Sequence, residues 1–165
     1  MAGNRDRPWP AIGTAAVVAM TTERITEIET GSALMAAAFD LRHEVFVIEQ
    51  GVPAELEIDA LDPSAIHLVA IAGETVVGTL RILQHEGVAK IGRVAVRAAA
   101  RGTGIGARLM ERAAAIARER GCRGIVLHAQ VSVAGFYRRL GYAEEGETFE
   151  EAGIPHVAMR KTIAR

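Results

Sequence analysis

The first part of the chain shows two kinds of hydrophobic pattern. Polar and apolar residues alternate over residues 24–28, which predicts a strand with one buried face. From Leu34 to Ile48 the apolar residues recur at intervals of three and four, the spacing of an amphipathic helix. Ser32 is a suitable N-cap for this helix, and Gly51 is expected to follow its end.

The middle of the chain predicts an antiparallel meander. Apolar runs typical of strands cover residues 66–71, 75–83 and 88–96. Short turns around Gly73 and Gly87 join these runs, and turns of this length connect neighbouring antiparallel strands.

An acidic segment, residues 53–63, precedes the meander. It carries four carboxylates among prolines and small residues, so it is expected to be a loop. Two interpretations remain open: the carboxylates are solvated, or they form a site that attracts a cationic amine.

The last third alternates helices and strands. Residues 105–120 have an apolar helical face, and residues 124–129 form a nearly continuous apolar run, as expected for a strand covered on both faces. The intervening helix predicts a right-handed parallel crossover. A short helix over residues 133–140 and two closing strands, 142–149 and 155–163, complete an α+β sheet with helices packed on it.

Composition limits the class of protein. A chain of 165 residues, half of them hydrophobic, is long enough for one domain with a single core. The 19 basic and 20 acidic residues nearly balance, which argues against nucleic acid or an acidic membrane as the main partner. Cys122 is the one cysteine, so an internal disulfide and a thiolate zinc site are excluded and no metal is expected.

Residues 1–20 are expected to be a flexible leader ahead of a single domain spanning residues 21–165. Their short apolar part lacks leucines and only loosely resembles a secretory signal. No stretch approaches the roughly 18 apolar residues of a membrane span. These observations predict a cytoplasmic protein, either a monomer or a homodimer.

The segment after the third meander strand predicts an anion site. Arg101-Gly102-Thr103-Gly104-Ile105-Gly106 places three glycines at every second position, directly before a helix. Glycines let the backbone approach a ligand closely, and the unpaired N–H groups at a helix start attract phosphate. Arg101 and Arg108 lie on either side of this turn, so a phosphate or pyrophosphate ligand is expected.

Three motifs together resemble the GCN5-related N-acetyltransferase (GNAT) superfamily, which acetylates amines with acetyl-coenzyme A. The glycine turn is similar to the family's pyrophosphate loop, and residues 136–142 (Phe-Tyr-Arg-Arg-Leu-Gly-Tyr) are similar to a second family segment. Residues 41–50, 91–94 and 151–156 resemble the ElaA/YjcF-type branch of small bacterial acetyltransferases.

The resemblance implies the GNAT acyl-CoA acyltransferase fold and its donor site. The fold is a mostly antiparallel, twisted sheet of six to seven strands flanked by about four helices, and its fourth and fifth strands splay apart to hold the cofactor. Tyr137 would be the general acid that protonates the departing thiolate. The residues implied to bind acetyl-coenzyme A are Val94, Ala95, Val96, Arg101, Gly102, Thr103, Gly104, Ile105, Gly106, Ala107, Gln130, Phe136 and Tyr137.

The acceptor half of the reaction is less defined. Many family members carry a glutamate on the strand before the pyrophosphate loop, but here that strand reads Lys-Ile-Gly-Arg over residues 90–93. A general base must reach the attacking amine, directly or through water. The candidates for the base are Glu49, Glu57, His67, Glu150 and His156. Of these, Glu49 and His156 are expected to be catalytic residues. The expected substrate contacts are Arg42, Glu57 and His67.

Two other functions remain open. Gly102, Gly104 and Ala107 also satisfy a dinucleotide-binding fingerprint, which would indicate an oxidoreductase, but the acidic residue expected about 20 positions later is missing. Alternatively, the chain is a catalytically weak regulatory module that binds acetyl-coenzyme A. The expected activity is therefore acetyl transfer to a primary amine of a small molecule or peptide, by direct attack in a ternary complex.

Overall fold

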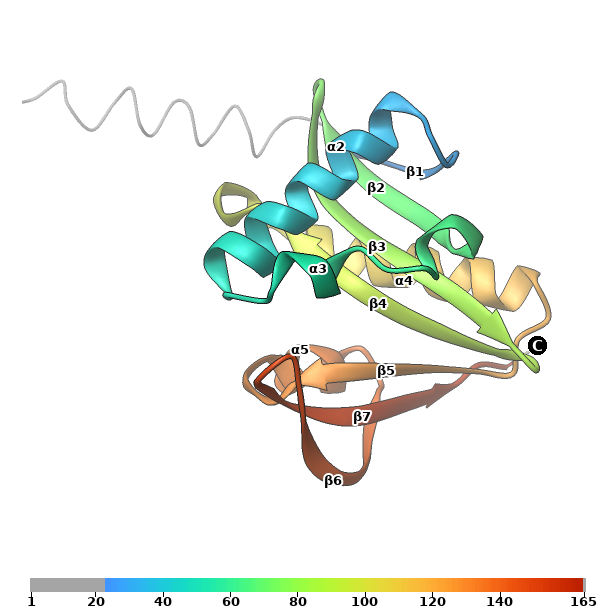
Figure 1. The fold of residues 1–165 in the computed structure, drawn as a ribbon. Helices are drawn as coiled ribbons and strands as arrows, with labels where there is room; N and C mark the ends of the chain where they lie inside the picture. Colours follow the sequence, from blue (N-terminus) through green and yellow to red (C-terminus); the bar gives the residue numbers. More distant parts are fainter. Residues whose placement is uncertain (1–22, 165) are drawn as a thin grey trace, which may run out of the picture.

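The computed structural model describes residues 23–164 and shows one twisted seven-stranded sheet (Figure 1). The predicted leader lies outside the described residues. The strand order is β1-β2-β3-β4-β5-β7-β6. The β2–β3–β4 meander is antiparallel and the β4–β5 pair is parallel, as the sequence predicted, and the remaining pairs are antiparallel. The strands are β1 (Glu23–Ile28), β2 (Ile66–Ala72), β3 (Thr75–His85), β4 (Val88–Val96), β5 (Gly124–Gln130), β6 (Ala143–Glu151) and β7 (Ile154–Thr162).

Helices cover both faces of the sheet (Figure 1). On one face, Leu41 of α2 packs against Val69 and Ile71 of β2; on the other, Leu109 and Ile116 of α4 belong to the larger core. None of the helices in residues 23–164 is long and apolar enough to cross a membrane. The helical elements are α2 (Ala33–Arg42), η1 (His43–Glu49), α3 (Ala54–Glu57), η2 (Asp62–Ser64), η3 (Ala98–Ala100), α4 (Ile105–Glu119), η4 (Val131–Val133) and α5 (Ala134–Arg139).

The helix predicted after Ser32 changes its winding halfway. Its first part is the α-helix α2, capped by the Ser32 hydroxyl, which accepts a hydrogen bond from the Met35 amide at 3.2 Å. From His43 it continues as the π-helix η1. Side-chain periodicity did not reveal this change, because one wider turn shifts the apolar positions only slightly. π-Helical turns are rare and often occur at functional sites.

The acidic segment is neither a plain loop nor solvated. It contains the short helices α3 and η2, and the Glu57 and Asp62 residues are each only 3% exposed. The expectation of a solvated loop was therefore wrong for these two carboxylates, because three arginines from other elements bind the segment from beneath.

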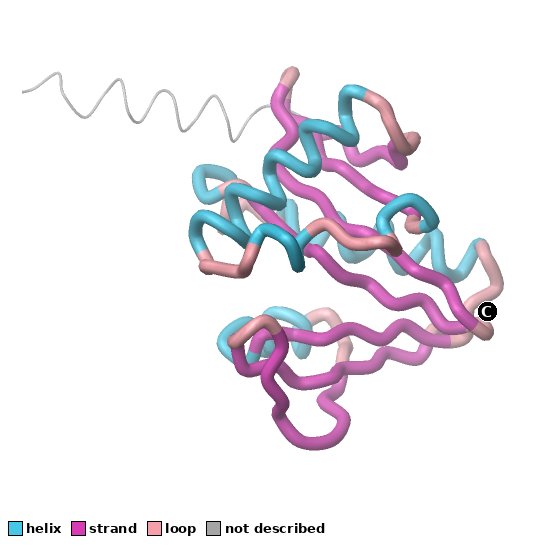
Figure 2. Tube along the Cα trace, viewed as in Figure 1, coloured by secondary structure: helices cyan, strands magenta, loops and turns pink. Residues whose placement is uncertain are grey.

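The strands β4 and β5 pair over only half their length. Their register runs from Val88 opposite Gly124 to Ile91 opposite Leu127, and beyond that point the two strands separate (Figure 2). The separation begins next to a β-bulge in β4, where Arg93 has a left-handed φ of 54°. Bulges bend a strand and often lie beside active sites. The predicted splay of the fourth and fifth strands is thus present.

The closing hairpin is tighter than the sequence suggested. Strand β6 continues to Glu151 instead of Phe149, so only two residues, Ala152 and Gly153, form the turn. Both have left-handed φ angles, 51° and 75°, as two-residue hairpin turns require. This turn places Glu151 and His156 at the same end of the hairpin.

Candidate active site

A cleft of about 900 Å³ opens where β4 and β5 separate. One wall is formed by η1 and the acidic segment, and the other by the start of α4 together with α5 and the β6–β7 turn. Segments far apart in the sequence therefore meet in one hollow, whose lining is partly apolar and partly charged.

Residues of the glycine turn line the cleft. Gly102 and Gly104 have φ angles of 79° and 86°, which strain any other residue, and Gly104 is the N-cap of the 15-residue helix α4. A side chain at Gly106 would place its Cβ 3.3 Å from Cζ of Phe136. Gly106 therefore lets α4 pack closely on Phe136, while the unpaired amides at the helix start are available to an anion.

Two arginines lie beside this turn and are held in place. The Arg101 Nε atom donates to the Val96 carbonyl at 2.9 Å, and its Nη2 atom binds the Glu49 carboxylate at 2.8 Å. Arg108 pairs with Glu23 at 2.6 Å. Each guanidinium beside the helix start is thus already paired with a carboxylate.

Tyr137 lines the cleft from α5 and is 8% exposed. Burial raises the pKa of its hydroxyl to about 12. The ring packs edge-to-face with Phe136 at a centroid distance of 5.0 Å and with Tyr142 at 6.1 Å. Packing and a proton-donor position are therefore compatible in this residue.

A second titratable group lies across the cleft, on the closing hairpin. The Nδ1 atom of His156 lies 2.6 Å from the Ile154 carbonyl, and its Nε2 atom lies 3.7 Å from Oε2 of Glu151. Because a carbonyl only accepts hydrogen bonds, Nδ1 carries the hydrogen and Nε2 is the basic atom of the neutral ring. The ring is stacked on Phe149.

Glu151 connects His156 to a second histidine. Its Oε1 atom lies 3.0 Å from Nδ1 of His128 on β5. Burial alone would raise the pKa of the Glu151 carboxyl, but the hydrogen bond from His128 and the charges of His128, His156 and Lys90 outweigh burial and lower that pKa. The carboxylate therefore stays ionised between the two rings.

A side-chain hydrogen bond joins two residues that line the cleft. The Gln130 amide at the end of β5 donates to the Gln50 side-chain carbonyl after η1 at 2.8 Å. These residues are 80 positions apart in the sequence. The bond joins the two walls on the side where the β4–β5 pairing has ended.

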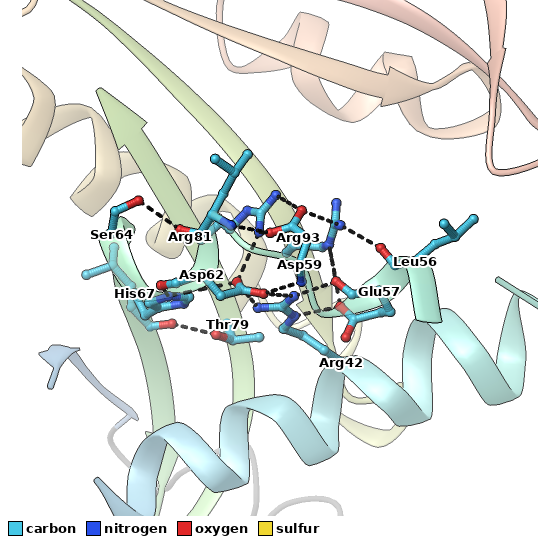
Figure 3. A network of polar contacts seen from close by, with 12 residues as sticks. Arg42, Leu56, Glu57, Asp59, Asp62, Ser64, His67, Thr79, Arg81 and Arg93 are labelled. Carbon is cyan, nitrogen blue, oxygen red and sulfur yellow. Dashed lines mark hydrogen bonds and ion pairs between the residues drawn. The ribbon is translucent and has the colours of Figure 1, made fainter. Parts of the chain in front are cut away.

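Beneath the acidic wall, the part of the cleft formed by the acidic segment (residues 53–63), lies a cluster of three arginines and three carboxylates (Figure 3). Arg42 binds Glu57 at 2.6 Å and Asp62 at 2.8 Å, and Arg81 binds Asp59 at 2.7 Å and Asp62 at 3.0 Å. The cluster ties α2, β3 and the acidic segment together.

Arg93 joins this cluster from the β4 bulge. It donates to the Glu57 carbonyl at 3.0 Å and to the Leu56 carbonyl at 3.2 Å, and contacts Asp59 at 3.3 Å. Burial, followed by repulsion from Arg81 and Arg42, lowers the pKa of its guanidinium. The bulge and the acidic wall are thus fixed to each other.

The carboxylates of the cluster are strongly held in the ionised form. The hydrogen bond from Arg81 is the main cause that lowers the pKa of Asp59. For Asp62, burial would raise the pKa, but hydrogen bonds from Arg42, the Asp59 amide and Arg81 hold it well below its usual value of 3.8.

The structure brings most of the sequence-predicted site residues together. Thr103 is an exception among the predicted donor-site residues, since it does not line the cleft and its hydroxyl donates to the Ala100 carbonyl at 2.6 Å. The predicted residues that line the cleft are Glu49, Glu57, Val94, Ala95, Val96, Arg101, Gly102, Gly104, Ile105, Gly106, Ala107, Gln130, Phe136, Tyr137 and His156.

Two predicted substrate contacts lie elsewhere. Arg42 and His67 are each 1% exposed and do not line the cleft. His67 Nε2 lies 2.8 Å from the Asp62 carbonyl, and Arg42 is committed to its carboxylates. The burial of Arg42 and His67 contradicts a direct contact with substrate. Glu57 lines the cleft, but its carboxylate is bound to Arg42.

Sequence reasoning did not single out Gln50, Lys90, Arg93, His128 or Glu151, all of which line the cleft. Gln50, Arg93 and Glu151 fall within the motifs that carried the family resemblance, so the motifs were the available signal. His128 is the one polar residue inside an apolar strand, which alternation could have marked as a residue on the open face.

A glycine turn before a helix, a split parallel strand pair and a buried tyrosine meet in one cleft, and this arrangement fits the acyltransferase class of enzyme. Comparison with known families shows which one: residues 20–163 match the GNAT acetyltransferase domain, and the chain belongs to that family. It is an N-acetyltransferase and not a dinucleotide-binding oxidoreductase.

Relatives support this assignment. The chain is 41% identical over 125 residues to the uncharacterized N-acetyltransferase YjcF of Bacillus subtilis. The matched region covers 75% of this chain and 89% of YjcF. It is similar to the crystal structure of an acyl-CoA N-acyltransferase from Pseudomonas aeruginosa (TM-score 0.76, 36% identity, 85% of this chain and 99% of that chain). It is also similar to Escherichia coli ElaA (TM-score 0.75, 29% identity, 86% and 99%). The expected fold and ElaA/YjcF-type branch are confirmed.

Proposed function

We propose that this N-acetyltransferase transfers the acetyl group of acetyl-coenzyme A to a primary amine of a small molecule or peptide, by direct attack in a ternary complex. The observation that carries the proposal is the meeting of the glycine turn, the unpaired edge of β4 and Tyr137 in one cleft. The family membership and the acyl-CoA relative support the choice of donor.

The donor half follows from the anion site. Nothing lies within 4 Å of the Cβ position of Gly102, and the left-handed φ angles of Gly102 and Gly104 turn the backbone so that a pyrophosphate can lie against the start of α4. Acetyl-coenzyme A supplies the activated acetyl thioester. Beyond Ile91, β4 has no partner on its β5 side, so the backbone of residues 92–96 can hydrogen bond to a ligand instead.

These backbone donors and Tyr137 have complementary roles. Preorganised N–H groups stabilise negative charge that develops on a carbonyl oxygen during acyl transfer. Tyr137, with a pKa near 12, keeps its proton at neutral pH and can give it to the departing thiolate. The backbone donors thereby stabilise the charge on the carbonyl oxygen, and Tyr137 neutralises the charge on the thiolate.

His156 is the proposed general base. Its Nδ1–H is bound to the Ile154 carbonyl, so Nε2 is free to take a proton from the attacking ammonium. The Glu151 carboxylate, 3.7 Å from Nε2, stabilises the imidazolium that results. Glu49 is the second candidate, but it would first have to leave its ion pair with Arg101.

The direct test follows thiol release from acetyl-coenzyme A with a panel of primary amines, and identifies the acetylated product by mass spectrometry. We expect amine-dependent release with one product per thiol. A chain that binds acetyl-coenzyme A but acetylates no amine would contradict the proposal and favour the regulatory module.

The base is tested with His156→Gln. We expect kcat/KM to fall about 100-fold at pH 7 and the loss to shrink toward pH 10, where free amine becomes abundant without a base. His85→Gln is the matched control, because His85 is exposed on the β3–β4 hairpin and outside the cleft lining. An unchanged pH profile for His156→Gln would assign the base elsewhere, with Glu49→Gln as the next variant.

A further inference from the structure

The exposed large apolar side chains of residues 23–164 are confined to two segments beside the cleft. One segment runs from η1 through the acidic wall, and the other is η4 at the end of β5. The residues are Ile48, Leu56, Ile58, Leu61, Val131 and Val133. Three of them, Leu56, Leu61 and Val133, line the cleft, and exposed apolar surface gathered at a cleft marks a binding site more often than single scattered residues do.

The acidic segment presents Leu56 and Leu61 to the cleft and turns Glu57 and Asp62 toward the arginine cluster, while Glu55 is exposed outside the cleft lining. Leu56 and Leu61 are 53% and 50% exposed and line the cleft, whereas Glu57 and Asp62, the residues next to them, are buried. Figure 3 shows the Leu56 side chain pointing away from the arginine cluster that holds the carboxylates. The side chains that this segment exposes in the cleft are therefore Leu56, Leu61 and the partly exposed Asp59, whose charge is paired with Arg81.

The charges in the cleft leave no unpartnered carboxylate for a second ammonium group. Each of the carboxylates that line it, Glu49, Glu57, Asp59 and Glu151, has an arginine or histidine partner. Lys90 also lines the cleft, and its positive charge contributes to lowering the pKa of the Glu151 carboxyl. A polycation would meet this lysine and find no free counter-charge.

We propose that the acceptor is a primary amine with an apolar body, an alkyl or arylalkyl amine whose apolar part lies against Leu56 and Leu61. Polyamines and other polycations are disfavoured. The proposal rests on the acetyl transfer proposed above and replaces the cationic acceptor to which the acidic sequence pointed.

A matched series of acceptors tests the class. Pentylamine and 1,5-diaminopentane have the same chain and differ in one ammonium group. We expect kcat/KM to be at least 10-fold higher for pentylamine. From butylamine to hexylamine, each added methylene should raise kcat/KM up to about fourfold while it is buried against the wall.

Variants test the surface. Leu56→Ser and Leu61→Ser should each raise the KM for hexylamine about 10-fold, with little change in kcat and none in the KM for acetyl-coenzyme A, because they remove uniform binding. The matched control is Ile58→Ser. Ile58 lies between them, is similarly exposed at 49% and does not line the cleft, so its kinetics should remain those of the wild type.

The outcomes separate the two proposals. Preferential acetylation of 1,5-diaminopentane would overturn the apolar acceptor while leaving acetyl transfer intact. The absence of acetylation with every amine would overturn both. Alternatively, a second copy of this chain could cover Leu56 and Leu61, which light scattering on the same variants tests. A dimer that becomes a monomer in Leu56→Ser, with unchanged acceptor kinetics, would also overturn the proposal.

Discussion

Replacing Tyr137 with phenylalanine removes a single oxygen atom from the cleft while keeping the ring. The edge-to-face contacts with Phe136 and Tyr142 belong to the ring, so the variant should fold with a stability within about 1 kcal/mol of the wild type. What is lost is a proton donor. With a pKa of about 12, only about one hydroxyl in 10⁴ is ionised at pH 8, so the donor is available throughout the usual working range.

The expected loss in kcat is about 100-fold, the lower end of the range for a general acid, and corresponds to about 2.7 kcal/mol in the barrier. Thiol release under saturating acetyl-coenzyme A measures it, and thermal unfolding checks the fold. Tyr142→Phe is the control, because Tyr142 is also buried but lies outside the cleft lining. The reasoning is refuted if Tyr137→Phe retains more than half of the wild-type kcat, or if both variants lose activity equally.

The arginine cluster yields two further predictions. Arg42→Met removes the ion-pair partner of the buried Glu57 and Asp62, so the free energy of unfolding measured in urea should fall by about 3 kcal/mol. The control Arg97→Met breaks a half-exposed pair with Glu44 and should cost less than 1 kcal/mol. Equal losses in the two variants would contradict this assignment. Acid should also destabilise the fold. The pKa of Asp62 in the folded chain lies well below its usual value of 3.8, so the unfolded chain binds more protons at low pH. The stability that this carboxylate supplies is therefore present above about pH 4 and declines as the pH falls further. Urea unfolding between pH 6 and pH 3 should show this decline, and Asp62→Asn should make it shallower; an identical slope would rule out the contribution of Asp62.

The order of helices and strands was readable from the sequence, because periodicity and turn residues act over a few positions. The glycine turn was equally readable, since Gly102 and Gly104 are needed for a local backbone conformation. The π-helical winding of η1 was not, because its side-chain pattern differs little from that of an α-helix.

The candidate site was only half predictable. Its donor residues are contiguous and carry a motif, whereas its acceptor residues come from separate elements. The Glu151 contacts to His128 and His156 depend on how β5, β6 and β7 align, and no local pattern specifies that alignment.

By itself, then, the sequence determined the elements, the fold family and the anion-binding turn. The tertiary structure alone decided which way the acidic segment faces. Arg42, Arg81 and Arg93 lie 15 to 37 positions from the atoms they bind, and their bonds turn the carboxylates inward and leave Leu56 and Leu61 toward the cleft. Burial of charge requires partners supplied by other parts of the chain, and a single segment cannot reveal whether those partners are present.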